Sequence, residues 1–179
     1  MKSSVDATAA AIVTPDPTNA GEAERLAKWR AAAVKAQATG KMANTLAKAL
    51  AKRFSDRWQF VDFLGPKGRE SAGVVDILAI RKSGAEPTVE GLKKLDAFDI
   101  HLIQVKGGEA PMPNDADKAR LRLVQKHYHA HHIILFQWKV GETASFSVLC
   151  AGDVWDKRTA LELFGTKSSN MNLKAGTTA

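Results

Sequence analysis

Two nearly continuous aliphatic runs constrain the fold of this 179-residue chain more than any other feature. They read GVVDILAI at residues 73–80 and IHLIQVK at residues 100–106. Strands buried on both faces of a sheet have this composition, because both alternating sets of side chains then need apolar neighbours. The sequence therefore predicts that both runs are inner strands of a sheet.

Hydrophobic periodicity predicts further elements around these two runs. We expect helices at 21–39, 41–54, 114–130 and 154–164, and additional strands at 58–64, 132–138 and 144–150. Gly40 is expected to end the first helix, Asn114 or Asp115 to cap the third, and Asp153 to cap the last, which Gly165 ends. This order predicts an α/β protein with a small mixed sheet flanked by helices, and an elaborated hairpin joins its two aliphatic strands.

The chain length suits one domain with a substantial core. We expect that domain to occupy residues 41–165, with an additional N-terminal helix at 20–40. The segments 1–19 and 166–179 are rich in small and polar residues without periodicity, so both are expected to be mobile tails.

Charge and cysteine content narrow the possible partners. The chain has 26 Lys and Arg against 19 Asp and Glu, a formal charge of +7 and a pI near 9.6, which favours a polyanionic partner such as nucleic acid. The single Cys150 excludes an internal disulfide and a multi-thiolate zinc site, and it favours a reducing compartment such as the cytoplasm. No stretch approaches the roughly 20 apolar residues of a membrane helix, so we expect no membrane partner.

Three polar residues interrupt the aliphatic runs, namely Asp76, Gln104 and Lys106. A charged group inside a dry strand costs several kcal/mol unless it is paired or coordinates something. Because side chains alternate along a strand, Gln104 and Lys106 share one face, and Asp76 meets them if the two strands pair. Gly107 and Gly108 follow directly, and we expect them to leave room for a ligand near the backbone.

An acid, an amide oxygen and an ammonium at one place suit a hard divalent cation whose remaining positions are filled by water and phosphate. Such an ion lowers the pKa of bound water, and a lysine can stabilise charge that develops on phosphorus. This chemistry is phosphodiester hydrolysis. The alternative is a purely structural ion pair between Asp76 and Lys106 at the strand ends, with Gln104 only hydrogen-bonded.

The motif GVVDILAI followed by LIQVKGG resembles the PD-(D/E)XK nuclease superfamily, which has an acid on one core strand and an acid-x-Lys on the next. The glutamine version is similar to Mrr-like restriction endonucleases and to relatives of Holliday junction resolvases. The order of elements over residues 41–150 resembles the same superfamily. The resemblance therefore implies a restriction-endonuclease-like α-β-β-β-α-β core, with the extra N-terminal helix and a C-terminal helix added to it.

The resemblance also implies roles for individual residues. Asp76 would be the metal-binding carboxylate, Gln104 a ligand through its carbonyl oxygen, Lys106 the catalytic lysine, and the metal Mg²⁺ or Mn²⁺. Ser71 stands where resolvase-like relatives have a serine near the scissile phosphate. Two departures remove negative charge: position 104 is an amide, and Asn44 stands in the leading helix where many relatives have a glutamate. Glu70, six residues before Asp76, is a candidate substitute ligand.

Basic residues outside the motif are candidate contacts to a nucleic-acid backbone. They are Lys67 and Arg69 in the loop GPKGRES, Lys48 and Lys52 in the leading helix, and Lys118 and Arg122 in the helix after the motif. The alternative for the helical lysines and arginines is an ordinary solvated face.

Histidines gather in KHYHAHH at residues 126–132, where a zinc site and a simple interaction with the end of a helix are both conceivable. The absence of an accompanying cysteine and the unusual spacing favour the helix-end interpretation. His101 faces away from Gln104 by strand alternation, and we expect it to be a satisfied core residue.

The sequence as a whole predicts a magnesium-dependent endonuclease that acts on DNA. Two alternatives stay open. One is a Holliday junction resolvase-like endonuclease, which would act as a homodimer, and the other is a catalytically inactive nucleic-acid-binding module of the same fold.

Overall fold

The computed structural model describes residues 17–63 and 73–165, and it is an α/β structure. Its helices are α1 (Pro17–Lys52), α2 (Asp115–Tyr128) and α3 (Ala160–Phe164), with a short 3₁₀ turn, η2, at Ala151–Asp153. Its strands are β1 (Gln59–Asp62), β2 (Ile77–Lys82), β3 (Phe98–Gly107), β4 (His132–Trp138), β5 (Ser145–Leu149) and β6 (Trp155–Arg158).

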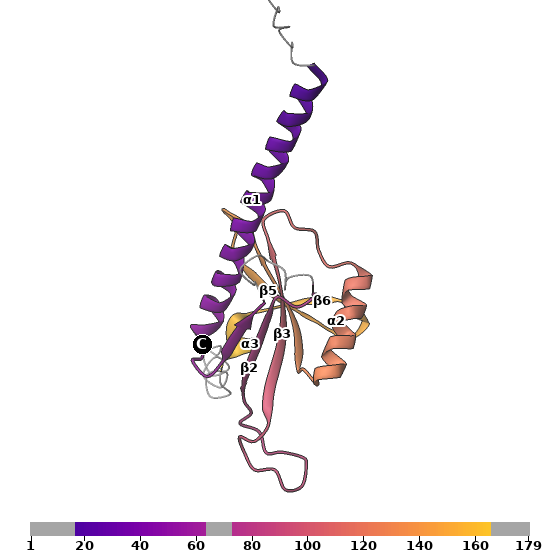
Figure 1. Cartoon of the computed structure of the whole chain (residues 1–179). Helices are drawn as coiled ribbons and strands as arrows, with labels where there is room; N and C mark the ends of the chain where they lie inside the picture. The colour runs from indigo at the N-terminus through magenta and orange to yellow at the C-terminus, as the bar shows by residue number, and fades with distance from the viewer. Residues whose placement is uncertain (1–16, 64–72, 166–179) are drawn as a thin grey trace, which may run out of the picture. The chain divides into compact units, whose positions relative to one another are not determined.

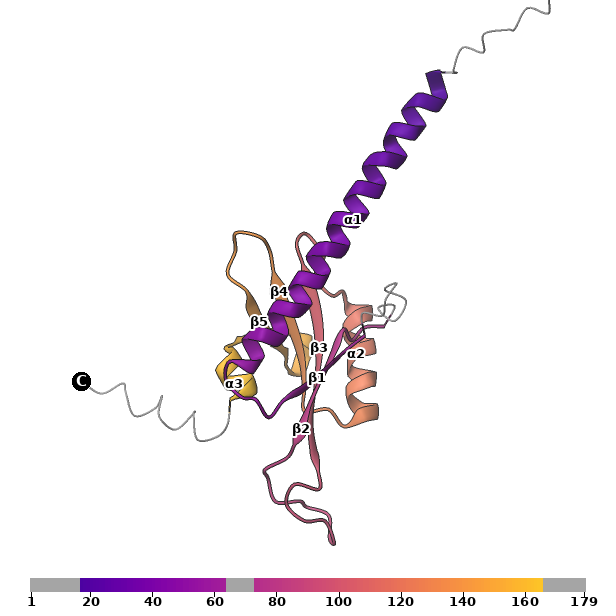
Figure 2. The ribbon, with the colours of Figure 1, turned by 60° about the vertical axis from the view of Figure 1, so that its left-hand side comes forward.

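The strands form a mixed sheet in which spatial order follows chain order, β1-β2-β3-β4-β5-β6. All neighbouring strands are antiparallel except β3 and β4, which are parallel. A parallel pair needs a long crossover, and here α2 supplies it and covers one face of the sheet (Figures 1 and 2). The aliphatic runs therefore occupy β2 and β3 inside the sheet, as predicted.

Side-chain alternation divides the core into two layers. On one face, Ile77 and Ile103 pack with the α1 residues Ala43, Ala47 and Ala51 and with α3. On the other face, Leu102 and Ile133 pack with Leu121 of α2. We call these the α1/α3 face and the α2 face; Figure 1 shows the helices on the two sides. Helices on both faces explain why the middle of β4 is apolar and why the middles of β3 and β4 are buried.

The expected break at Gly40 is wrong, because α1 continues through it as one helix. Gly40 has open space where a side chain would stand, and the alanines and lysines around it are good helix formers that outweigh one glycine. Residues up to Lys35 and residues from Ala36 onwards form two separate compact units. Although α1 has 36 residues, it is too polar to cross a membrane, and no other helix in the described part of the chain is long and apolar enough.

The helix predicted after the motif is confirmed as α2, and Asn114 is its N-cap. The Asp117 N–H donates to the Asn114 side chain at 2.9 Å, and the Asn114 N–H donates to the Asp117 carboxylate at 3.3 Å. This reciprocal pair satisfies two backbone donors at the helix start and fixes where α2 begins.

The predicted closing helix at 154–164 is wrong in its first half. Residues Trp155–Arg158 form strand β6, which pairs with β5, and α3 begins only at Ala160. Thr159 rather than Asp153 caps α3, through a capping box with Glu162, whereas Gly165 ends the helix as expected. The gain from pairing with the otherwise free edge of β5 overrides the helical propensity of these residues.

Candidate active site

Asp76 stands immediately before β2 and is tied to both neighbouring strands. Its N–H donates to the Ile103 carbonyl at 3.0 Å, and its carbonyl accepts from the Phe63 N–H at 3.1 Å. Its carboxylate accepts from the Val105 N–H at 2.7 Å. The side chain therefore takes the place of a backbone acceptor at the end of the β2–β3 ladder, which fixes the carboxylate against β3.

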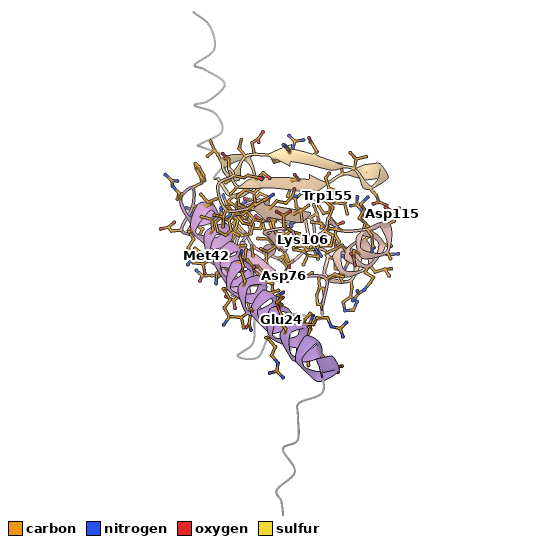
Figure 3. The ribbon with its side chains drawn as sticks, turned by 90° about the horizontal axis from the view of Figure 1, so that it is seen from above. Glu24, Met42, Asp76, Lys106, Asp115 and Trp155 are labelled. Carbon is orange, nitrogen blue, oxygen red and sulfur yellow. The ribbon has the colours of Figure 1, made fainter. Side chains whose placement is uncertain are left out.

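Gln104 and Lys106 flank Val105 and lie on the α2 face, because they alternate with Ile103 and follow Leu102 by two and four residues. The pairing of Ile77 with Ile103 brings Asp76 beside Gln104. Asp76 and Lys106 lie close together in Figure 3, and the lysine charge acts on the aspartate. The structure thus brings together the three polar residues of the two aliphatic runs.

The charge of Asp76 is only partly compensated by its surroundings. Burial raises the pKa of Asp76 above its ordinary value, against the lowering effects of the Val105 N–H and the Lys106 charge. Asp76 and Lys106 do not form a direct ion pair, and the Lys106 ammonium has no hydrogen-bond partner among the described residues. The structural ion pair that the sequence left open is therefore not formed.

Gln104 is 6% exposed, and its Oε1 atom is buried with no hydrogen-bond partner in the described part of the chain. Leaving such an acceptor unsatisfied costs about 1–3 kcal/mol. A divalent cation is one group that would satisfy a carbonyl oxygen here, with Asp76 as its charged ligand. Within residues 17–63 and 73–165, no cluster of three His, Cys, Asp or Glu side chains could hold a metal, and Asn44 in α1 is buried. Asp76 and Gln104 thus fit a cation that takes its other ligands from water and phosphate.

A polar row that the sequence reasoning missed continues the group across the sheet. The strand register places Lys106 beside Gln137 of β4, and Gln137 beside Ser145 of β5. These side chains line a cavity of about 310 Å³ together with Lys157 of β6. Lys157 has no hydrogen-bond or ion-pair partner among the described residues.

Part of this polar row could have been predicted from the sequence. Alternation along HIILFQW places Gln137 on the same face as Ile133, and a parallel β3–β4 pair would bring it to Lys106. The place of Lys157 in this row could not be predicted, because its segment was predicted to be helical.

Gly107 does not make room for a ligand as expected, whereas Gly108 lines the cavity beside Lys106. A Cβ atom on Gly107 would stand 3.1 Å from both the Ala43 Cβ and the Thr39 carbonyl oxygen, and one on Gly108 would stand 3.3 Å from the Thr39 side chain. The close approach at this point is that of α1. The glycines therefore serve the packing of the helix on the sheet.

Several predicted nucleic-acid contacts are engaged within the protein. Lys48 pairs with Asp62, and the Lys52 ammonium stands 5.9 Å from the centre of the Phe60 ring. Lys118 pairs with Asp115 at 3.1 Å. Arg122 donates to the Cys150 carbonyl, to Asp153 and to Gln125, and so anchors the turn between β5 and β6.

The predicted roles of the loop residues Lys67, Arg69, Glu70 and Ser71 fall outside the described residues. His101 is a core residue as expected, but it is not satisfied, because its buried Nδ1 has no partner in the described part of the chain.

No protein-family model matches the chain, and no curated protein is similar to it.

Proposed function

We propose that this protein is a metal-dependent nuclease that hydrolyses phosphodiester bonds in DNA, and that its core is restriction-endonuclease-like. The observation that carries the proposal is the hydrogen bond from the Val105 N–H to the Asp76 carboxylate. It holds the acid beside the two residues that flank Val105, Gln104 and Lys106. The order helix, three antiparallel strands, crossover helix and parallel strand also supports the proposed fold.

Each residue has a separate role in this proposal. Asp76 and Gln104 would hold Mg²⁺ or Mn²⁺, which supplies a nucleophilic water at neutral pH and charge neutralisation at the phosphate. Val105 orients the carboxylate through its N–H. Lys106, whose ammonium has no direct partner among the described residues, donates to a phosphoryl oxygen and stabilises the charge that develops there.

The row beyond Lys106 would bind the substrate backbone. Lys157 provides a second ammonium in the same cavity, unpaired within the described part of the chain, and Gln137 and Ser145 provide neutral donors. Contacts of this kind position phosphates without reading sequence.

The test is incubation of the full chain with plasmid, linear, single-stranded and four-way-junction DNA and with RNA, in Mg²⁺ or in chelator. Cleavage should require the metal and be lost in Asp76→Asn and Lys106→Met. Asparagine can still accept from the Val105 N–H, so the first variant spares the fold. Lys126→Met, which removes an exposed lysine of α2 that has no partner in residues 17–63 and 73–165, is the matched control and should cut normally.

A second candidate function is a nucleic-acid-binding module without catalysis. It is favoured by the small ligand set, since one carboxylate, that of Asp76, is bonded beside Gln104 and Lys106, and no three His, Cys, Asp or Glu side chains of the described residues could hold a metal ion. Metal-independent binding without cutting of any substrate would support this module and refute the nuclease. Selective cutting of four-way junctions by a dimer would identify a resolvase.

A further inference from the structure

A second polar cavity lies on the α1/α3 face of the sheet, at the opposite end of β3 from Lys106. It has a volume of about 540 Å³, and Leu163 and Gly165 close one side of it. Its polar lining includes Arg57, Arg81, Asp99, His101, His131 and His132. We call it the arginine pocket. By strand alternation it is separated from Asp76, Gln104 and Lys106 by the sheet itself.

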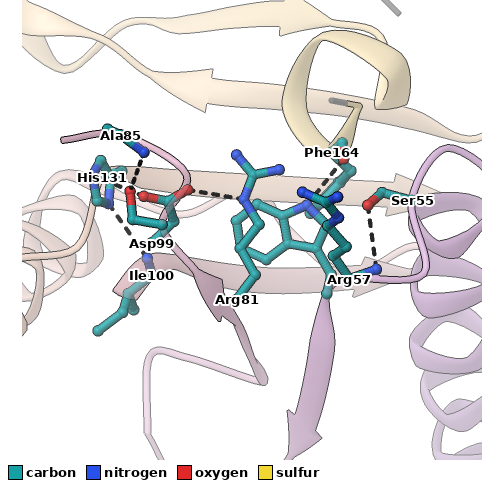
Figure 4. Close-up of polar contacts among 10 residues, drawn as sticks. Ser55, Arg57, Arg81, Ala85, Asp99, Ile100, His131 and Phe164 are labelled. Atoms are coloured by element: carbon teal, nitrogen blue, oxygen red, sulfur yellow. Dashed lines mark hydrogen bonds and ion pairs between the residues drawn. The ribbon is translucent and has the colours of Figure 1, made fainter. Parts of the chain in front are cut away.

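Arg81 makes two contacts in this pocket, and Figure 4 shows its hydrogen bond to Asp99. Its guanidinium carbon stands 4.4 Å from the centre of the Trp58 ring, and its Nε donates to Asp99 at 2.9 Å. Trp58 is itself buried, and its Nε1 donates to the Phe164 carbonyl at 3.0 Å. The two terminal amino groups of Arg81 have no hydrogen-bond partner among the described residues, so the stacked guanidinium keeps donors free.

Arg57 adds a second guanidinium to the lining. Its side chain is exposed and has no ion-pair partner among residues 17–63 and 73–165. The acids nearby are already engaged: Asp99 accepts from Arg81, and Glu162 accepts from Thr159. Counting Lys82, the lining has three cations and two carboxylates, an excess of one positive charge with the histidines neutral.

The histidines add imidazole groups to the lining rather than a metal site. His101 is 4% exposed, and its Nδ1 is buried without a partner in the described part of the chain. The His131 Nδ1 accepts from the Ile100 N–H at 3.4 Å, and its Nε2 stands 3.6 Å from Asp99. No three of the described His, Cys, Asp and Glu side chains converge as metal ligands, and two arginines would repel a cation. The ligand that this lining suits is an anion.

We propose that the arginine pocket binds a phosphate monoester. The planar guanidinium fork matches phosphate oxygens in pairs, and two such forks with adjacent imidazole donors suit a dianion better than a single carboxylate. The volume accommodates a nucleotide-sized group. The ligand is a free phosphate compound or the terminal phosphate of a nucleic-acid strand, which share this chemistry. The site is independent of the proposed nuclease centre on the other face.

The first experiment is calorimetric titration of the full chain with inorganic phosphate. Arg57→Gln should weaken binding by about tenfold or more, because it removes one charge-assisted contact. Arg53→Gln, an equal charge change four residues away and outside the pocket, should bind like the wild type. Arg81→Lys keeps the charge but loses the fork, and it should also bind more weakly. Absence of phosphate binding, or equal losses in Arg57→Gln and Arg53→Gln, would overturn the proposal.

The second experiment identifies the source of the phosphate. In the Asp76→Asn background, oligonucleotides with and without a 5′ or 3′ terminal phosphate are compared. A preference for one phosphorylated end that Arg57→Gln abolishes assigns the pocket to strand ends. Equal binding of all oligonucleotides, with inorganic phosphate still bound, assigns it to free phosphate compounds. Both readouts are binding, so they stand whether or not the protein cleaves DNA.

Discussion

Strand β3 carries two polar groups that differ in how their charges are compensated. At its beginning, on the α1/α3 face, Asp99 is bonded directly to Arg81, and the guanidinium lies on Trp58. Near its end, on the α2 face, Asp76 is bonded to a backbone N–H, and Lys106 has no direct partner. The ion pair with Asp99 orients Arg81 for the proposed phosphate binding, whereas Asp76 and Lys106 form no direct ion pair and could each contact a metal or phosphate in the proposed nuclease. The same strand thus lies between the proposed phosphate pocket and the proposed nuclease centre.

Each group also has one buried polar atom without a partner among the described residues, the Nδ1 of His101 and the Oε1 of Gln104. Such atoms destabilise the fold, and the apolar layers on the two faces must offset them. The difference between the two groups can be tested by removing the apolar support, or by titrating or replacing the unpartnered atoms.

The largest expected effect is on the α1/α3 face. Phe164 is fully buried, its ring contacts those of Trp58, Phe60, His101 and Phe146, and its carbonyl accepts from Trp58. Phe164→Ala should lower the free energy of unfolding by about 3–5 kcal/mol, measured by denaturant titration. Val154→Ala, at an exposed position, is the control and should change it by less than about 0.5 kcal/mol. A small loss in Phe164→Ala would mean that α3 does not support the arginine pocket.

The second effect is a pH dependence that arises at His101. Burial first, and then the charges of His132, His131 and Arg81, lower its pKa from 6.5 to about 3. Between these values the unfolded chain binds a proton at this residue and the folded chain does not, so stability falls as the pH falls. From pH 7.5 to pH 5 the loss should be about 2 kcal/mol.

The measurement compares unfolding of the wild type and His101→Leu at both pH values. The other groups titrate in both proteins, so the difference between the two losses reports His101. Equal losses would show that His101 is not held neutral, and the pocket would then have a different charge from the one described.

The success of the sequence analysis differs between elements for physical reasons. The central strands and α2 were predictable, because burial on both faces and the Asn114 cap leave local signals. The continuation of α1 through Gly40 and the formation of strand β6 could not be predicted, because both depend on neighbours in space. Sequence alternation brought Gln104 and Lys106 together, but the bond between Asp76 and Val105 depends on the strand register.

The arginine pocket could not be predicted from the sequence for the same reason. Its residues are scattered from position 57 to position 165, and only the fold brings Arg57, Arg81 and the histidines to one cavity. The histidine cluster in KHYHAHH could be recognised in the sequence, but the residues that line the pocket with it could not. No local pattern marks Arg81 as a stacked, oriented cation, since that depends on Trp58 lying beneath it.

A third prediction concerns the unpartnered amide of Gln104. Gln104→Met replaces the unpartnered amide with an apolar side chain of similar size, so the free energy of unfolding should rise by about 1 kcal/mol. Cleavage of DNA should fall at the same time, since the proposed ligand is lost. The matched control is Gln125→Met, whose amide donates to Ala130 and accepts from Arg122, and which should lose about 1 kcal/mol. Destabilisation of Gln104→Met instead would show that the amide is satisfied in the folded protein.

The smallest effect concerns Lys48, a predicted phosphate contact that pairs with Asp62 at a partly exposed position. Lys48→Met should cost about 0.2–1 kcal/mol of stability, and less at high salt, as for other partly exposed pairs. Because the ammonium is engaged by Asp62, the salt dependence of DNA binding should stay unchanged. Asp62→Asn, which frees Lys48, is the complementary variant. A decrease of about 0.9 in the slope of log affinity against log salt for Lys48→Met would mean that this lysine leaves Asp62 for a phosphate, and positive charge on α1 would then belong to the DNA-binding surface.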